Sequence, residues 1–353
     1  MNADALSFLK TLMQQPSPSG FEVPAQAVVR KRMEASADGV RADVHGNVIG
    51  ILNEKAPVKV MLAGHVDEIG LMITHVDANG FLFFAAIGGW DPLVAVGQRV
   101  SIAAARGAVP GVIGRKPIHL LDAAERDKGL KLDDLWIDIG AKDKADALKS
   151  VAVGDSVVVT HDFLTLKNGL VSSRAFDDRV GAWAVTEVLG ALKRRKLKVA
   201  VYAVSTVQEE VGLRGAVTSA YQVNPDIGIA VDVGFTSDYP GGDPKKVGDI
   251  GLNKGPILHR GANINPVLGR LLCDTAARHK IPFQMQAEPR GTGTDANAMQ
   301  LSRGGCAAAL VSVPNRYMHS PVEVVSLSDL EATVSLIAET LASLTGRERF
   351  IPG

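Results

Sequence analysis

The chain has 353 residues, of which 46% are hydrophobic and 22% are charged, and its 38 acidic side chains balance its 38 Lys and Arg side chains. That length can bury a large core and is more typical of two domains than of one. A net charge of zero gives no field that attracts nucleic acid or an anionic membrane, so we expect a small-molecule partner and neither of those two.

Two helices are predicted at the start of the chain, over residues 4–14 and 24–35, because apolar residues recur there at helical spacing. The segment 16–20, which contains Pro and Gly, separates them. Asp4 stands where a signal peptide would have basic residues, and no apolar run approaches the length of a bilayer span. We therefore expect a cytoplasmic protein.

Strand-like apolar runs alternate with helical patterns along most of the remaining chain. Strands are predicted at 58–63, 199–207, 227–231, 282–287 and 307–313, and helices at 180–192 and 266–279. Strands that are separated by helices form βαβ units, whose strands run parallel. The sequence thus predicts an α/β fold with a mixed, mainly parallel sheet flanked by helices.

Residues 71–163 have a different pattern, with short strand-like runs, many turn signals and a helical pattern only around 143–149. An insertion is tolerated where its two ends lie close together on the host surface. We predict a host α/β domain of residues 1–70 and 164–353, with an inserted small β-barrel-like domain between them. The apolar residues Trp90 and 81–84 of the insert are suited either to its core or to an interface.

Two adjacent glutamates, Glu209 and Glu210, follow the apolar run 199–204. A strand buried on both faces has no use for two carboxylates at its end unless negative charge or proton transfer is needed there. The pair therefore indicates a site that binds a metal, moves a proton, or does both.

Other polar residues follow the remaining strands: His65 and Asp67 after the first, Asp232 at the end of the third, and His319 in the loop after the last. Ligand sites in open α/β sheets lie beyond the carboxyl ends of the strands, so we expect these residues to converge. The two cysteines, Cys273 and Cys306, favour neither a disulfide framework nor a thiolate zinc site. Histidine and carboxylate ligands suit Zn²⁺, Co²⁺ or Mn²⁺.

Each of these residues also has an ordinary structural explanation. Asp177 and Asp178 precede a predicted helix, where Asp is more often a cap than a catalytic residue. His65 on its own is more often a hydrogen-bonded core histidine, but Asp67 lies on the same side and can hold its imidazole tautomer. Asp232 suits a turn and His319 a loop cap. The coincidence of all of them favours a site.

The motifs around these residues resemble the tetrahedral-type dinuclear metallo-aminopeptidases, which include glutamyl, leucyl and deblocking aminopeptidases and relatives often labelled endoglucanases. The resemblance is carried by residues 63–70, 175–179, 208–215, 232–233 and 316–320, and it extends to 87–89, 97–100, 255–256, 263–266 and 293–296. It covers nearly the whole chain. It implies a zinc-peptidase-like catalytic domain and makes the insert a dimerisation domain.

The resemblance also implies a metal centre. Asp177 would bridge two divalent ions, Zn, Co or Mn, with His65 and Asp232 completing one site and Glu210 and His319 the other.

The same resemblance leaves Glu209 free of metal as the general base. Asp67 would orient His65, and Asp178 would follow Asp177 through a cis peptide bond. Such a centre activates water to hydrolyse a peptide bond, and Glu209 would pass the proton of that water to the leaving amine.

The loop 290–295 is placed beside the active site by the resemblance, which makes Gly293, Thr294 and Asp295 candidates for substrate binding. Its alternative is an ordinary turn in which Asp295 caps the next helix. A preference for acidic substrates would require a basic group in the side-chain pocket, for which Arg290, Arg260 and Lys254 are candidates.

The function implied is removal of N-terminal residues from short peptides by a homo-oligomer, in which dimers assemble into a larger tetrahedral particle. One alternative is a related metal-dependent hydrolase of acyl-amino acids or dipeptides. A glycoside hydrolase would use Glu209 with a second carboxylate, but three Trp and four Tyr offer few surfaces for sugar stacking. A non-enzymatic binding protein would be expected to lack some of the ligands.

Overall fold

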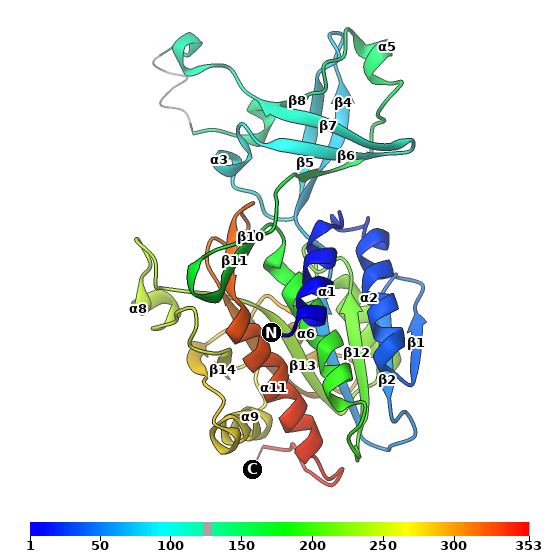
Figure 1. Ribbon diagram of the computed structural model, residues 1–353, viewed down its shortest axis with the longest axis vertical. Helices are drawn as coiled ribbons and strands as arrows, with labels where there is room; N and C mark the ends of the chain where they lie inside the picture. Colours follow the sequence, from blue (N-terminus) through cyan, green and yellow to red (C-terminus); the bar gives the residue numbers. More distant parts are fainter. Residues whose placement is uncertain (123–128, 353) are drawn as a thin grey trace.

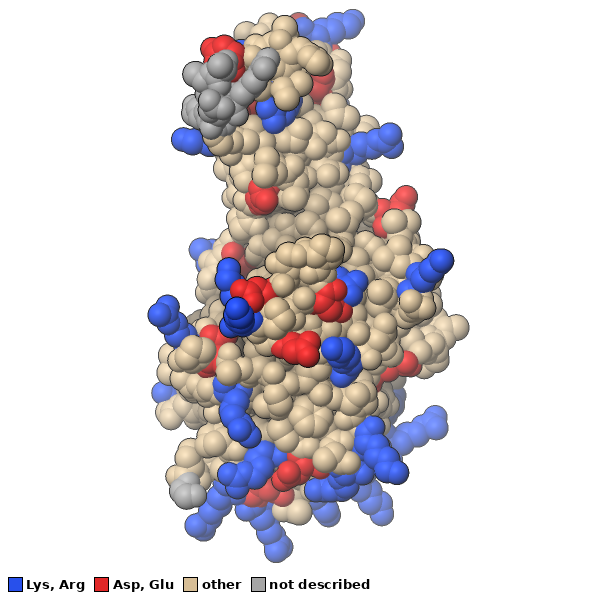
Figure 2. All heavy atoms as spheres, turned by 90° about the vertical axis from the view of Figure 1, so that its left-hand side faces the viewer, with Lys and Arg blue, Asp and Glu red and all other residues tan. Residues whose placement is uncertain are grey.

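The computed structural model describes residues 1–122 and 129–352. It has an α/β body and a β-barrel that stands on one end of it (Figure 1). The molecule narrows to a waist where the barrel joins the body (Figure 2). The predicted combination of a mixed α/β fold with a barrel-like insertion is confirmed.

An eight-stranded sheet in the order β1-β2-β12-β3-β13-β16-β14-β15 forms the centre of the body. Its strands are β1 (Gly39–Ala42), β2 (Val48–Leu52), β3 (Lys59–His65), β12 (Ala200–Thr206), β13 (Ile227–Phe235), β14 (Ile257–Gly261), β15 (Gln284–Glu288) and β16 (Ala307–Asn315). The four central strands β12, β3, β13 and β16 are parallel, whereas β2 and β14 run antiparallel to their central neighbours. The carboxyl ends of the central strands therefore meet at one edge of the sheet.

Helices cover both faces of this sheet. They are α1 (Ala3–Gln14), α2 (Val23–Ser36), α6 (Phe176–Leu192), α7 (Arg214–Val223), α9 (Pro266–His279), α10 (Asp295–Gln300) and α11 (Leu327–Ser343). A further short helix, α8 (Pro244–Val247), lies at the periphery and has no buried residue (Figure 1). Helix α6 packs on β3 and β13 and is itself contacted by α1, α2 and α11, while α7 and α10 pack together on the opposite face. No helix in the described part of the chain is long and apolar enough to cross a membrane.

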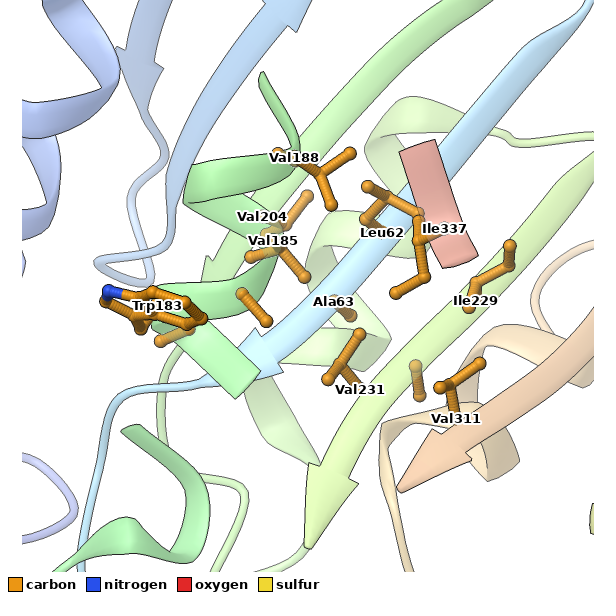
Figure 3. Close-up of a cluster of buried hydrophobic side chains, with 14 of the residues drawn as sticks. Leu62, Ala63, Trp183, Val185, Val188, Val204, Ile229, Val231, Val311 and Ile337 are labelled. Atoms are coloured by element: carbon orange, nitrogen blue, oxygen red, sulfur yellow. The ribbon is translucent and has the colours of Figure 1, made fainter. Parts of the chain in front are cut away.

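The main core lies between α6, α11 and the sheet (Figure 3). Leu62 of β3, Val231 of β13 and Val185 of α6 belong to this core, and all three are buried. Since both faces of β3 are covered, its residues from Val60 to Ala63 are all apolar and buried. The continuous apolar runs in the sequence are explained by this double coverage.

Six antiparallel strands form the closed barrel β4-β5-β8-β7-β6-β9. They are β4 (Gly70–Val76), β5 (Leu82–Ile87), β6 (Arg99–Ala104), β7 (Gly107–Gly114), β8 (Trp136–Asp138) and β9 (Ser156–Val159). The barrel has a hydrophobic core of its own, to which Leu82 and Phe84 belong and against which Trp90 packs. Most of the apolar cluster noted in the insert is therefore used for its interior.

Several short elements complete the described structure. They are the helices α3 (Pro92–Ala95) and α5 (Lys144–Ala147), the 3-10 turns Ile118–Leu120, Leu132–Asp134 and Lys167–Gly169, and a three-stranded sheet of β10 (Leu164–Thr165), β11 (Leu170–Ser173) and β17 (Glu323–Ser326). The small sheet lies where the chain returns from the barrel to the body (Figure 1).

Candidate metal centre and active site

A first group of possible metal ligands lies at the carboxyl edge of the central strands. His65 ends β3, Asp232 lies in β13, and Glu209 follows β12. One ligand atom from each lies within 4.8 Å of the others. The His65 Nε2 atom is 3.7 Å from Glu209 Oε2 and 4.0 Å from Asp232 Oδ1.

A second group is formed by Asp177, Glu210 and His319, again with ligand atoms within 4.8 Å of one another. Asp177, in the first turn of α6, lies between the two groups. Its Oδ1 atom is 3.3 Å from His65 Nε2, and its Oδ2 atom is 3.3 Å from His319 Nε2. One carboxylate thus presents an oxygen to each histidine, which is the arrangement that a bridging ligand requires.

The backbone around Asp177 is unusual. The peptide bond between Asp177 and Asp178 is cis, as the resemblance implied. The Asp178 carboxylate accepts hydrogen bonds from the backbone N–H groups of His65 (3.1 Å) and Gly181 (3.0 Å), which joins α6 to the end of β3. Gln208 and His319 also have positive φ values of 55° and 60°. Non-glycine residues in this conformation cluster at functional sites.

Asp67 supports the two glutamates more directly than it supports His65. The His65 Nδ1 atom is 3.1 Å from the backbone oxygen of Asp67, but 3.5 Å from its carboxylate. That carboxylate instead accepts hydrogen bonds from the backbone N–H groups of Glu209 (3.1 Å) and Glu210 (3.2 Å) and from the hydroxyl of Ser19 (2.6 Å). A hydrogen bond from Nδ1 to the Asp67 carbonyl leaves Nε2 free to face the carboxylates.

Glu323, which the sequence reasoning did not single out, performs a similar task on the second group. Its carboxylate accepts hydrogen bonds from the backbone N–H groups of Asp177 (2.8 Å) and His319 (3.0 Å). Glu323 starts β17 and follows His319 by only four residues. This closeness to a candidate ligand was the one sequence signal for a role of Glu323.

The two groups contain four acidic side chains and only two histidines, so ionisation of all four carboxyls is unfavourable there. Burial, together with neighbouring carboxylates, raises the pKa of Glu209 to about 10 and the pKa values of Glu210 and Asp232 to about 8. Burial opposes protonation of His65, but the nearby carboxylates outweigh it and raise its pKa well above the usual value. The groups therefore lack cationic charge.

A divalent cation would supply that charge, and the residues present fit one. Glu210 Oε1 is buried and has no hydrogen-bond partner in the described structure. Within that structure no Lys or Arg forms an ion pair with Asp177, Glu209, Glu210 or Asp232. Nitrogen and carboxylate oxygen donors are suited to Zn²⁺, Co²⁺ and Mn²⁺. The geometry therefore provides two candidate metal sites that share Asp177.

Both groups open into a cavity of about 270 Å³. Of the three loop residues predicted to bind substrate, Gly293 and Thr294 line it, whereas Asp295 does not. The Asp295 carboxylate instead accepts a hydrogen bond of 2.5 Å from the Thr206 hydroxyl. Asp295 is the first residue of α10 and not its cap, because the cap position belongs to Thr294.

Four further polar residues line this cavity without having been predicted: His259 from β14, Gln286 and Glu288 from β15, and Ser312 from β16. The segment 284–288 alternates polar and apolar residues, which is typical of a strand with one polar face. That alternation predicts the face on which Gln286 and Glu288 lie, but it does not place them beside the metal ligands.

A loop of the barrel contacts the second group of ligands. A Cβ atom on Gly88 would lie 3.3 Å from Glu210 Oε2 and 2.7 Å from Ile69 Cγ2, and one on Gly89 would lie 3.3 Å from His319 Nδ1. Gly88 also has a φ of +74°, which side chains other than glycine rarely adopt. This loop of the barrel therefore lies against the side chains of Glu210 and His319.

Known aminopeptidases are similar to this protein over nearly its whole length. A sequence model of the family described as M42 glutamyl aminopeptidase matches residues 46–336. The lysyl aminopeptidase of Pyrococcus furiosus is 36% identical over 340 residues, which cover 95% of this chain and 96% of that protein.

Two solved structures are similar in fold and in sequence. The TET aminopeptidase from a marine sediment archaeon, Thaumarchaeota archaeon, has a TM-score of 0.92 at 35% identity, with 97% of both chains covered. The TET1 peptidase of Pyrococcus horikoshii, which can assemble into a tetrahedron or a large octahedral shell, has a TM-score of 0.86 at 34% identity. That match covers 96% of this chain and all of the other.

The contact between the barrel loop and the candidate ligands Glu210 and His319 can be tested with a pair of glycine variants. Gly88→Ala is expected to weaken zinc binding about tenfold or more, because the new methyl group displaces Glu210. Gly97→Ala is the matched control, since Gly97 lies in the same domain, has the same φ of +74°, and a methyl group there would have no other atom within 4 Å. Isothermal titration with Zn²⁺ measures both. Equal zinc affinity in the two variants would contradict a role for the loop.

Proposed function

The chain belongs to the M42 glutamyl aminopeptidase family, and we propose that it removes N-terminal residues from short peptides with two divalent metal ions and with Glu209 as the general base. Membership makes it a hydrolase that acts on peptides. The observation that carries the finer proposal is the position of Asp177, whose two oxygens each lie 3.3 Å from the Nε2 atom of a different histidine.

In this proposal Asp177 holds both ions, while His65 and Asp232 hold one and Glu210 and His319 hold the other. Zn²⁺, Co²⁺ and Mn²⁺ all suit these donors. When bound, such ions lower the pKa of water and polarise the scissile carbonyl. The other contributions come from the side chains of the protein.

Glu209 is the side chain proposed to move the proton. Without cations, burial raises the pKa of Glu209 to about 10, which would keep it protonated at neutral pH. Two bound cations would lower that pKa and favour the carboxylate form that a general base requires. Its backbone is fixed by Asp67, and it borders the cavity in which a peptide would lie. Glu209 would accept the proton of the attacking water and then donate it to the leaving amine.

Glu209 and Glu210 differ in their surroundings, which supports two separate roles. Glu210 Oε2 is 3.6 Å from His319 Nε2, within the second ligand group. Glu209 is also close enough to His65 to be a ligand of the first group, so its assignment as a base requires a test. A glutamine in its place cannot accept the proton, whereas a bound metal would be kept if Asp177, His65 and Asp232 suffice.

The free amine of a substrate would be bound by the acidic wall of the same cavity. Glu209, Glu210 and Asp232 all line it. An ammonium group has three hydrogen-bond donors and positive charge, both of which these carboxylates complement. A peptide with an acylated N-terminus lacks that charge. Hydrolysis of the free but not the acylated peptide therefore distinguishes an aminopeptidase from an acyl-amino-acid hydrolase.

The Glu209→Gln variant is expected to retain its metal content and to lose about 10²–10⁴-fold in kcat, because general-base catalysis contributes that much. Metal content by plasma mass spectrometry and hydrolysis of aminoacyl-p-nitroanilides measure the two effects. Glu34→Gln is a control on the exposed surface of α2 and should behave like the wild type. Loss of metal in Glu209→Gln would instead make Glu209 a ligand, and near-normal turnover would exclude it as the base.

We also propose that the barrel is a dimerisation domain and that dimers assemble into a larger, tetrahedral particle. The assembly described for the related peptidase of Pyrococcus horikoshii supports this. Exposed apolar side chains on the described part of the barrel support it as well, and they are Leu93, Val112, Ile118, Leu120, Leu148 and Val153. Light scattering coupled to size-exclusion chromatography should give a mass of many subunits. A monomer at micromolar concentration would contradict the proposal.

A further inference from the structure

The cavity at the metal centre continues along one face of the sheet, away from the metal ligands. Its floor consists of Leu310 and Ser312 from β16, His259 from β14, and Gln286 and Glu288 from β15. His259 pairs with Gln286 in the β14–β15 register, so their side chains lie next to each other on one face. Glu288 lies two residues further along the same strand, on the same face.

The polar atoms in this part of the cavity lack partners in the described structure. His259 is 7% exposed, and its Nε2 atom is 2.9 Å from the Ser312 hydroxyl, but its Nδ1 atom has no hydrogen bond. Gln286 Oε1 is also buried without a partner. The carboxylate of the half-buried Glu288 forms no hydrogen bond or ion pair with any described residue. Buried polar groups are normally paired, so a ligand is the expected partner here.

The neutral state of His259 allows its Nδ1 atom to accept a hydrogen bond in one of the two imidazole tautomers. Burial lowers the pKa of His259 to about 4, which leaves the imidazole neutral at neutral pH. A neutral imidazole has one nitrogen that donates and one that accepts. If Nε2–H donates to Ser312, the Nδ1 atom accepts. His259, Gln286 and Glu288 then offer acceptors from three neighbouring side chains.

No cationic side chain balances these acceptors. No Lys or Arg is among the described residues that line the cavity. Arg260, one of the candidates for binding an acidic substrate, lines a separate cavity together with Arg270. Arg290 and Lys254 line neither of these two cavities. An acidic side chain in the pocket would therefore face Glu288 without a counter-ion, which is unfavourable.

We propose that this part of the cavity selects a long cationic side chain, lysine or arginine, at the N-terminus of the substrate, an inference that rests on the aminopeptidase function proposed above. The Glu288 carboxylate would pair with the cation, and Gln286 Oε1 and His259 Nδ1 would accept its remaining hydrogen bonds. A lysine ammonium has three donors and no acceptor, which matches three acceptors. Its aliphatic stem would pack along Leu310 and Met318, which also line the cavity.

Lysyl- and norleucyl-p-nitroanilide test this proposal, because norleucine has the same aliphatic chain without the ammonium group. The wild type is expected to favour lysine in kcat/KM by about tenfold or more. Glu288→Gln should reduce that ratio by about tenfold, mainly through a higher KM for the lysyl substrate, with norleucyl hydrolysis unchanged. Glu54→Gln, at an exposed position remote from the cavity, is the matched control and should keep the wild-type ratio.

Norleucyl hydrolysis by Glu288→Gln also shows that the variant is folded. If it fails to fold, Gln286→Leu replaces it and should likewise lower the preference for lysine. A wild type that favours the glutamyl or norleucyl anilide, or a lysine preference that survives Glu288→Gln, overturns the pocket assignment and leaves the aminopeptidase function standing. Failure of the wild type to hydrolyse any aminoacyl anilide overturns the proposed function and this inference together.

Discussion

Burial of carboxylates at the edge of an apolar sheet is the constraint on which the rest of the structure depends. Asp177, Glu209 and Asp232 are all at most 9% exposed, and ionised groups at such depth are stable only if they are paired. Elsewhere in the protein, arginine balances a buried carboxylate, since buried Glu68 forms ion pairs with Arg174 and Arg179. The candidate metal centre has only two histidines instead. If all of its carboxyls were ionised, their charge would be unbalanced without bound cations.

The architecture brings these carboxylates together through backbone geometry. Parallel strands end at one edge, and α6 approaches β3 so closely that a Cβ atom on Gly64 would overlap the backbone of Gly181. This contact places the first turn of α6, with Asp177, next to His65. Three further carboxylates, those of Asp67, Asp178 and Glu323, then hold the backbone of the candidate site residues through hydrogen bonds. The acidic residues thus divide into those that face the ligand space and those that support them.

The sequence predicted the fold well where a pattern extended over a whole element. The apolar runs indicated the central strands, and helical spacing indicated α1, α2, α6 and α9, because double coverage of the sheet demands both patterns. It missed β1, β2, β14 and β17, which are only four or five residues long, although β2 is a continuous apolar run. The candidate site followed from strand ends and from resemblance, and the structure brings those residues together. Their roles stay predictions. His259, Gln286 and Glu288 were missed because they approach the centre only through the antiparallel pairing of β14 with β16.

The most direct test of the bridged metal centre is anomalous X-ray scattering from crystals grown with Zn²⁺ or Mn²⁺. Two peaks per chain are expected, one on each side of the Asp177 carboxylate. The first should lie beside His65 and Asp232, and the second beside Glu210 and His319. The Glu209 carboxylate should bind neither ion, so its distance from each peak should exceed about 2.2 Å, the length of a metal–carboxylate bond. A single peak, or a peak bonded to Glu209, would contradict a bridged two-metal centre with a free glutamate base.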